Sequence, residues 1–266
     1  MSAQNRPDAQ GAAGTGHRPR PSHEIVSLGA AWEMDGQAVA GFLARPIDGT
    51  PRPGLVLLSN MRGLSHNQRE LTRRYARAGF VALTVDVLHG QLPRTRTEGR
   101  QAMNTLDVQA AIPQILSGAD YLRSLAWVGP QGRVGVLGFC LGGGLALLAL
   151  SRSDRLQAGV IYHQSLFPDP RSLETIQAPL ICHYGPLDRS TPREEVEAFA
   201  AALDACGKRY ELHSYDGMGH GFAEPPPDEE VPPAQRAASD LSHDRSIDFL
   251  CRELGTDAHS GPRSEP

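Results

Sequence analysis

A cysteine between two closely spaced glycines is the residue of this chain best placed for covalent chemistry. Cys140 lies in Gly138-Phe139-Cys140-Leu141-Gly142, with an apolar strand pattern before it (134–137) and an apolar, helix-like run after it (145–150). This layout is typical of a tight strand–turn–helix elbow that presents a nucleophile, here with cysteine in place of serine. The glycines leave room for the turn to close, and the free N–H groups of a helix N-terminus favour a thiolate. The alternative is a buried, inert cysteine in a glycine-rich turn.

Two later loops carry an acid and a histidine, each just beyond a predicted strand. Asp188 follows a strand pattern at 177–185, and His220 lies between glycines after a strand pattern at 210–215. Each has an ordinary alternative: Asp188 as a turn residue, and His220 as one of ten histidines. Together they predict a Cys-His-Asp triad. The order nucleophile, acid, histidine is that of the α/β-hydrolase fold and differs from the orders in chymotrypsin and subtilisin.

The elements that must position these residues alternate along the chain. Strand patterns at 23–28 and 38–44 surround the turn Asp35-Gly36, and buried strands are predicted at 54–58, 80–85, 133–137 and 158–162. Helices are predicted at 67–78, 102–125, 193–206, 234–253 and from the elbow to about 152, and 87–101 reads as a long polar loop. This alternation predicts an α/β fold with a mostly parallel sheet of about eight strands and helices on both faces.

Composition bounds the domain organisation and the class of protein. The three motifs need one another, so residues 23–254 are interpreted as one domain, between a disordered N-terminal tail (1–22) and a flexible C-terminal tail (255–266). A net charge of −4 gives no footprint for nucleic acid, and no apolar run is long enough to cross a membrane. We therefore expect a cytoplasmic monomer or small homo-oligomer with reduced cysteines. The four cysteines lack metal-ligand spacing, so neither a metal nor a cofactor is predicted.

From about residue 24 to 253 the chain resembles the dienelactone hydrolase family of α/β-hydrolases. The most specific segment is Gly138-Phe139-Cys140-Leu141-Gly142-Gly143, and the loops around Asp188 and His220 match the acid and histidine loops of the family. The resemblance implies that Cys140 is the nucleophile, that His220 is the base and acid, and that Asp188 orients His220. It also implies an oxyanion hole formed by the backbone N–H groups of Leu141 and Met61.

The chain departs from the family pattern at two positions. The resemblance would supply a glutamate that engages the resting thiol just before Met61, where this chain has Asn60. It would also supply an arginine that holds a substrate carboxylate just after the histidine, where this chain has Glu224. A second family arginine has possible counterparts in Arg94, Arg96 and Arg100. The fold and reaction type survive these changes, but a dienelactone substrate does not follow.

Several residues are candidates for the substrate pocket, each with an alternative. Asn60 either contacts the thiol or substrate or satisfies loop backbone groups, and His163 either lines the pocket or is a satisfied polar residue at the sheet edge. Arg62 and Arg100 either attract an anion or are solvated surface charges. Glu224, beside His220, is expected to repel an anionic substrate.

The leading hypothesis from the sequence is a hydrolase that cleaves a small ester or lactone through a thioester acyl-enzyme. A second hypothesis uses the same thiol for acyl transfer, isomerisation or lyase chemistry in a biosynthetic or degradative pathway. A third is a non-catalytic protein of the same fold that binds a small ligand.

Overall fold

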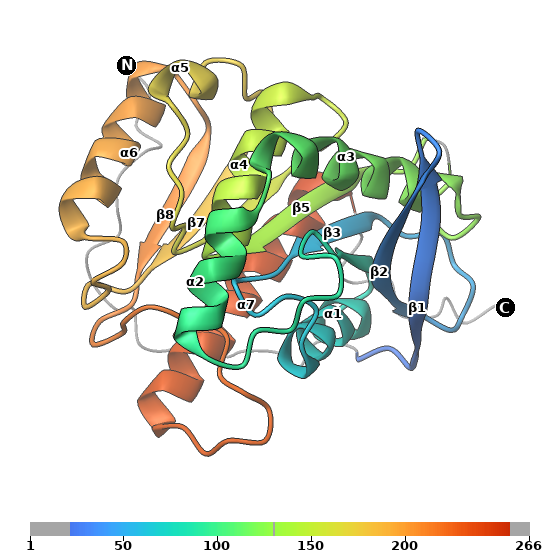
Figure 1. Cartoon of the computed structure of the whole chain (residues 1–266), viewed down its shortest axis with the longest axis horizontal. Coiled ribbons are helices and arrows are strands. Elements are labelled where there is room, and N and C mark those ends of the chain that lie inside the picture. The colour runs from blue at the N-terminus through green and yellow to red at the C-terminus, as the bar shows by residue number, and fades with distance from the viewer. Residues whose placement is uncertain (1–21, 130, 256–266) are drawn as a thin grey trace, which may run out of the picture.

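The chain forms an eight-stranded sheet in the order β1-β2-β4-β3-β5-β6-β7-β8 (Figure 1). The structure is a computed structural model that describes residues 22–129 and 131–255. Residues 1–21 and 256–266, which make up nearly all of the two predicted tails, lie outside the described residues. The strands are β1 (Ile25–Met34), β2 (Gln37–Pro46), β3 (Gly54–Leu58), β4 (Val81–Val85), β5 (Val134–Phe139), β6 (Gly159–Tyr162), β7 (Leu180–Tyr184) and β8 (Tyr210–Ser214).

The sheet combines an antiparallel edge with a parallel body. β1 and β2 form a hairpin around Asp35-Gly36, both residues of which have positive φ, as a tight hairpin turn requires. β2 pairs antiparallel with β4, and every other pair is parallel. β3, β4, β5, β6 and β7 are buried along their whole length, which explains their continuous apolar sequences.

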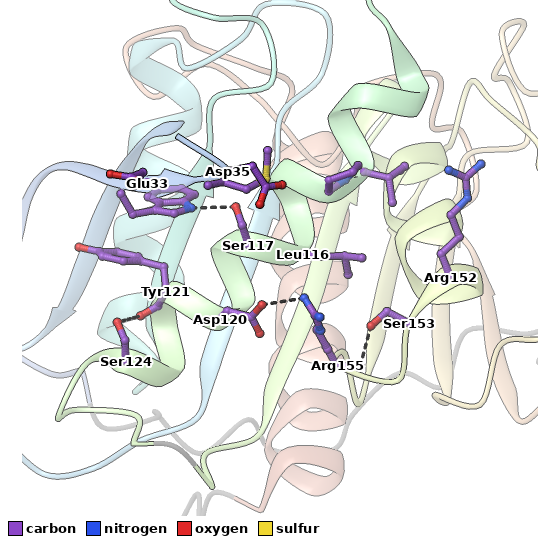
Figure 2. Close-up of a pocket in the computed structure, with 14 residues that line it drawn as sticks. Glu33, Asp35, Leu116, Ser117, Asp120, Tyr121, Ser124, Arg152, Ser153 and Arg155 are labelled. Carbon is purple, nitrogen blue, oxygen red and sulfur yellow. Dashed lines mark hydrogen bonds and ion pairs between the residues drawn. The ribbon is translucent and has the colours of Figure 1, made fainter. Parts of the chain in front are cut away.

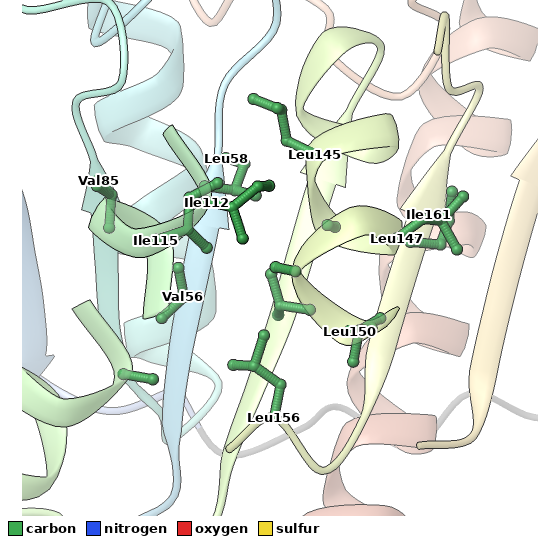
Figure 3. Packing of buried hydrophobic residues seen from close by; sticks show 14 of the residues in the cluster. Val56, Leu58, Val85, Ile112, Ile115, Leu145, Leu147, Leu150, Leu156 and Ile161 are labelled. Carbon is green, nitrogen blue, oxygen red and sulfur yellow. The ribbon is translucent and has the colours of Figure 1, made fainter. Parts of the chain in front are cut away.

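Helices cover both faces of the sheet. The helices are α1 (His66–Arg77), α2 (Arg96–Thr105), α3 (Val108–Ser124), α4 (Leu141–Arg152), α5 (Pro170–Leu173), α6 (Arg193–Ala205) and α7 (Pro233–Leu254). One apolar cluster joins α3, α4 and α6 to one face, where Ile112 and Ile115 of α3 pack near Val56 of β3 (Figure 3). A second cluster joins α1 and α7 to the other face. The predicted α/β-hydrolase architecture, with its mostly parallel sheet of eight strands, is confirmed.

The segment between β4 and β5 differs from the prediction of a polar loop followed by one long helix. A helix already begins at Arg96, because the Thr95 side chain caps it by accepting from the Glu98 N–H. The helical path then breaks at Leu106, and Asp107 caps α3 by accepting from the N–H groups of Gln109 and Ala110. Two polar N-caps therefore divide what periodicity alone reads as a loop and a single helix.

Within residues 22–129 and 131–255, no helix has both the length and the apolarity needed to cross a membrane.

Candidate active site

Cys140 lies at a sharp turn between β5 and α4. Its backbone has φ 54° and ψ −113°, a conformation that L-residues rarely adopt and that costs roughly 1–3 kcal/mol. The turn closes so tightly that a Cβ on Gly138 would lie 2.0 Å from the Gly142 carbonyl oxygen, and one on Gly142 would lie 2.4 Å from the Leu58 carbonyl oxygen. The elbow predicted from the glycine spacing is therefore present, and it packs directly against the end of β3.

Replacing Gly138 with alanine should destabilise the protein by about 3 kcal/mol or more, because the clash is with backbone that cannot rotate away. Gly29→Ala is the matched control, since a Cβ there meets nothing within 4 Å, and it should change the free energy of unfolding by less than about 0.5 kcal/mol. Urea unfolding of the two variants gives the comparison. A Gly138→Ala protein with wild-type stability would contradict the tight elbow.

The Cys140 side chain is held in a partly closed, polar setting. Only 7 % of the residue is exposed, and it immediately precedes the first turn of α4. Its sulfur lies 3.5 Å from the Ser165 hydroxyl, and the Ser165 N–H donates to the Cys140 carbonyl over 3.1 Å. Ser165 was not predicted as a site residue, because a serine three residues beyond a strand carries no sequence signal of its own.

His220 and Asp188 lie together at the same edge of the sheet. His220 Nδ1 is 2.7 Å from Asp188 Oδ2, while Asp188 Oδ1 accepts from the N–H groups of Ser190 (2.7 Å) and Thr191 (3.1 Å). The Cys140 thiol helps to raise the pKa of His220, whose side chain keeps 29 % of its surface exposed. Cys140, His220 and Asp188 thus lie just after β5, β8 and β7, and a hydrogen bond joins His220 to Asp188.

His220 and Asp188 shift each other's pKa toward the charged forms. Burial acts to lower the pKa of His220, but its hydrogen bond to Asp188, its interaction with the Cys140 thiol and the charges of both partners raise the pKa to about 10. Burial acts to raise the pKa of Asp188, but hydrogen bonds from His220, Ser190 and Thr191 hold it below its usual range. At neutral pH the pair is therefore an imidazolium beside a carboxylate.

The start of α4 and the turn after β3 carry the two N–H groups predicted to form the oxyanion hole. Leu141 is the first residue of α4, so its N–H has no acceptor within the helix. Met61 lies in a turn after β3 that is fixed by hydrogen bonds from the Gly63 N–H to the Asn60 carbonyl (3.2 Å) and from the Arg62 N–H to Asn60 Oδ1 (2.8 Å). Because Gly142 packs on the carbonyls of Leu58 and Ser59, the elbow and this turn are neighbours.

A buried polar cluster lies next to the histidine. Asn60 Nδ2 donates to Glu224 Oε1 over 2.8 Å, and His163 Nε2 lies 3.7 Å from Glu224 Oε2. His163 is completely buried with φ 33°, and its ring centroid is 4.6 Å from that of His220. Three of the predicted pocket candidates thus gather around His220, although His163 reaches no solvent.

The predicted arginines lie farther out. Arg62, Arg94, Arg96 and Arg100 are all exposed, and the last two belong to α2 rather than to a loop. α2 nevertheless covers the turn after β3, since a Cβ on Gly99 would lie 2.8 Å from Met61 Sδ. Arg100 therefore follows a residue that packs on Met61, but its own side chain is exposed.

A pocket of about 770 Å³ lies elsewhere, between β1, α3 and the end of α4 (Figure 2). Trp32 stacks on Tyr121 at one side of it, and Arg155 pairs with Asp120 at another. Cys140, His220 and Asp188 are not among the residues that line this pocket, so it is separate from the candidate site.

Comparison with known proteins places the chain in a family. The model of the Dienelactone hydrolase family matches residues 39–254. A probable 2-oxo-3-(5-oxofuran-2-ylidene)propanoate lactonase from Bradyrhizobium sp. is 28% identical over 203 residues, which are 71% of this chain and 81% of the relative. A carboxymethylenebutenolidase from Pseudomonas putida is 24% identical over 225 residues, covering 81% and 92% of the two chains.

The solved structure of P91, a dienelactone hydrolase-like promiscuous phosphotriesterase from metagenomic libraries, superposes on this chain. The TM-score is 0.73 and the sequence identity is 20%. The match covers 87% of this chain and 99% of that one, and shows the shared fold. With a family model that spans nearly the whole sheet, this chain belongs to the dienelactone hydrolase family and is a dienelactone hydrolase-like hydrolase.

Proposed function

We propose that this protein hydrolyses small esters or lactones through a Cys-His-Asp triad and a thioester acyl-enzyme. The observation that carries the proposal is the 2.7 Å hydrogen bond between His220 and Asp188, together with Cys140 at a strained elbow, where its thiol acts on the pKa of His220. Family membership supports the reaction class, since the relatives named above include a lactonase and a carboxymethylenebutenolidase. Turnover of small esters or lactones that disappears when Cys140 is replaced is the direct test.

Acylation begins from the thiolate–imidazolium pair. The Cys140 sulfur attacks the carbonyl carbon, and the N–H groups of Leu141 and Met61 donate to the resulting oxyanion, each contributing about 3 kcal/mol. Collapse breaks the bond to the leaving oxygen, which takes the proton of His220. The product is a thioester on Cys140 and a neutral His220.

Deacylation uses the same histidine as a base. Once Cys140 is acylated, its contribution to the high pKa of His220 is gone, so the ring holds a proton less tightly. His220 takes a proton from water as the water oxygen attacks the thioester, and collapse expels the Cys140 thiolate. The acid product leaves and the thiolate–imidazolium pair is restored.

Substrate charge follows from the residues beside His220. The expected repulsion of anions assumed an ionised Glu224, but burial raises its pKa to about 8, against the lowering effects of His220, Asn60 and Arg62. At pH 7 the group is mainly neutral, so anions are disfavoured there chiefly because the site lacks an arginine fork for a carboxylate. Above pH 8 the ionised group adds repulsion.

We expect the wild type to hydrolyse a neutral lactone better than dienelactone, which carries a carboxylate, by roughly tenfold in kcat/KM (about 1.4 kcal/mol). The ratio should widen from pH 7 to pH 9. Glu224→Arg should shift it toward the anion, whereas Glu195→Arg, on the exposed face of α6, should leave it unchanged. A tenfold wild-type preference for dienelactone, or an unchanged ratio in Glu224→Arg, would contradict the prediction.

A further inference from the structure

Glu224 joins two loops that the proposed reaction uses. Its side chain is 4 % exposed, and its Oε1 accepts from Asn60 Nδ2 over 2.8 Å. Its backbone carbonyl accepts from Asn67 Nδ2, in the first turn of α1, over 2.9 Å. Glu224 follows His220 by four residues, and Asn60 directly precedes Met61. This contact therefore ties the loop of the histidine to the turn of the second oxyanion donor.

The orientation of Asn60 fixes the role of each oxygen of Glu224. The Arg62 N–H donates to Asn60 Oδ1 over 2.8 Å, so the amide nitrogen of Asn60 must face Glu224. Oε1 of Glu224 is then an acceptor. A proton on the carboxyl group belongs on Oε2, toward His163.

The groups that face Glu224 leave it short of compensating charge. His163, at the end of β6, is completely buried, which lowers its pKa to about 3 and keeps it neutral beside Oε2. The remaining charged neighbours are His220, four residues earlier in the loop after β8, and Arg62, an exposed residue in the turn after β3. Burial outweighs both and raises the pKa of Glu224 to about 8.

We propose that Glu224 is a positioning residue that works as a neutral carboxylic acid, holding the turn of Met61 against the loop of His220, and that its ionisation slows the reaction at alkaline pH. The inference rests on the proposed function, because it assigns Met61 and His220 their roles. An ionised Glu224 would place a negative charge against Asn60, the residue directly before the proposed oxyanion donor Met61. It would also stabilise the imidazolium of His220, which weakens that ring as the base of deacylation.

The test compares pH profiles of kcat and KM for a neutral ester, from pH 6 to 9.5, in the wild type, Glu224→Gln and Glu224→Ala. Wild-type kcat should fall about tenfold between pH 7 and pH 9, as expected for one group with a pKa near 8. Glutamine keeps the acceptor for Asn60 and cannot ionise, so Glu224→Gln should retain most of the wild-type kcat at pH 7 and lose this fall. Glu224→Ala should lose about tenfold or more at pH 7.

Asn60→Ala and a surface variant sharpen the comparison. The Asn60 hydrogen bond favours the charged form of Glu224, so Asn60→Ala should move the alkaline midpoint to higher pH. Glu195→Gln, the same chemical change on an exposed face, should follow the wild-type profile. Deprotonation of His220 is common to the wild type and Glu224→Gln, so the difference between their two profiles isolates the ionisation of Glu224.

Thermal unfolding gives a readout that does not depend on activity. The folded pKa of Glu224 is raised above its ordinary value of 4.5, so its stabilising contribution is complete below pH 4.5 and is lost as pH rises toward about 8. The melting temperature of the wild type should therefore fall relative to that of Glu224→Gln between pH 5 and pH 8.

The inference is overturned if Glu224→Gln shows the same alkaline fall in kcat as the wild type, or if it loses as much activity at pH 7 as Glu224→Ala. These outcomes are distinct from failure of the proposed function, which is judged by Cys140→Ala. If Cys140→Ala still turns over the ester, the proposed triad is wrong. If Cys140→Ala is inactive but the wild type and Glu224→Gln have the same pH profile, only the proposed role of Glu224 is wrong.

Discussion

Replacing Cys140 with alanine is expected to reduce ester turnover by at least about ten-thousand-fold, because no other group of the site supplies the thiolate. Alanine keeps the Cβ of the elbow, so the turn and its strain should persist and the protein should remain folded. The measurements are steady-state turnover of a small neutral ester and the mass of the protein after iodoacetamide. The wild type should gain an adduct on the Cys140 peptide that the variant lacks.

The other cysteines provide the controls. Cys206 caps the end of α6 and Cys251 is buried in α7, so Cys206→Ala and Cys251→Ala should keep both turnover and the Cys140 adduct. Cys140→Ser should be much slower than the wild type, since a hydroxyl is a poor nucleophile in a site that favours a thiolate. Retained turnover in Cys140→Ala would count decisively against covalent catalysis by this residue.

Asp188→Asn should lower kcat/KM by about ten-thousand-fold while leaving the fold intact. Asp188 Oδ1 accepts two backbone N–H groups, so an asparagine would keep its oxygen there and turn its NH₂ group toward His220 Nδ1. Nδ1 would then have to accept, which places the ring proton on the nitrogen that should serve Cys140. The charge that helps to raise the pKa of His220 would also be lost.

Asp107→Asn is a matched control for this change. Asp107 Oδ1 likewise accepts from two backbone N–H groups, at the start of α3, but it makes no contact with the triad. Its variant should keep wild-type kcat/KM, and circular dichroism should show both variants folded. If Asp188→Asn retains activity within about tenfold of the wild type, the orienting role of Asp188 is wrong.

Local sequence signals predicted the parts of the site whose geometry is local. The spacing of Gly138 and Gly142 encodes the elbow, because a Cβ on either residue would lie only 2.0 or 2.4 Å from a backbone carbonyl oxygen. The strand patterns before Asp188 and His220 predicted where the acid and histidine loops begin. Parallel strands then bring these loops to one edge of the sheet.

The start of α2 depends on contacts that the hydrophobic periodicity of the sequence does not predict. The segment from Arg96 is polar, and its sequence predicts a loop, yet Thr95 caps a helix there, and Gly99 packs on Met61. Arg100, which the sequence places in a polar loop, is therefore carried on a helix.

The sequence by itself determined the fold class, the elbow and the order of the three triad candidates, since each depends on residue type and short-range spacing. Only the tertiary structure decided the state of Glu224. Asn60 and Glu224 are 164 residues apart, and nothing local indicates that they share a hydrogen bond or that His163 lies neutral beside them. The charge on a carboxyl group depends on how far folding removes it from water and on which charges remain nearby. Both are properties of the folded chain, which is why a residue expected to be a repelling carboxylate is a buried, mainly neutral acid at pH 7.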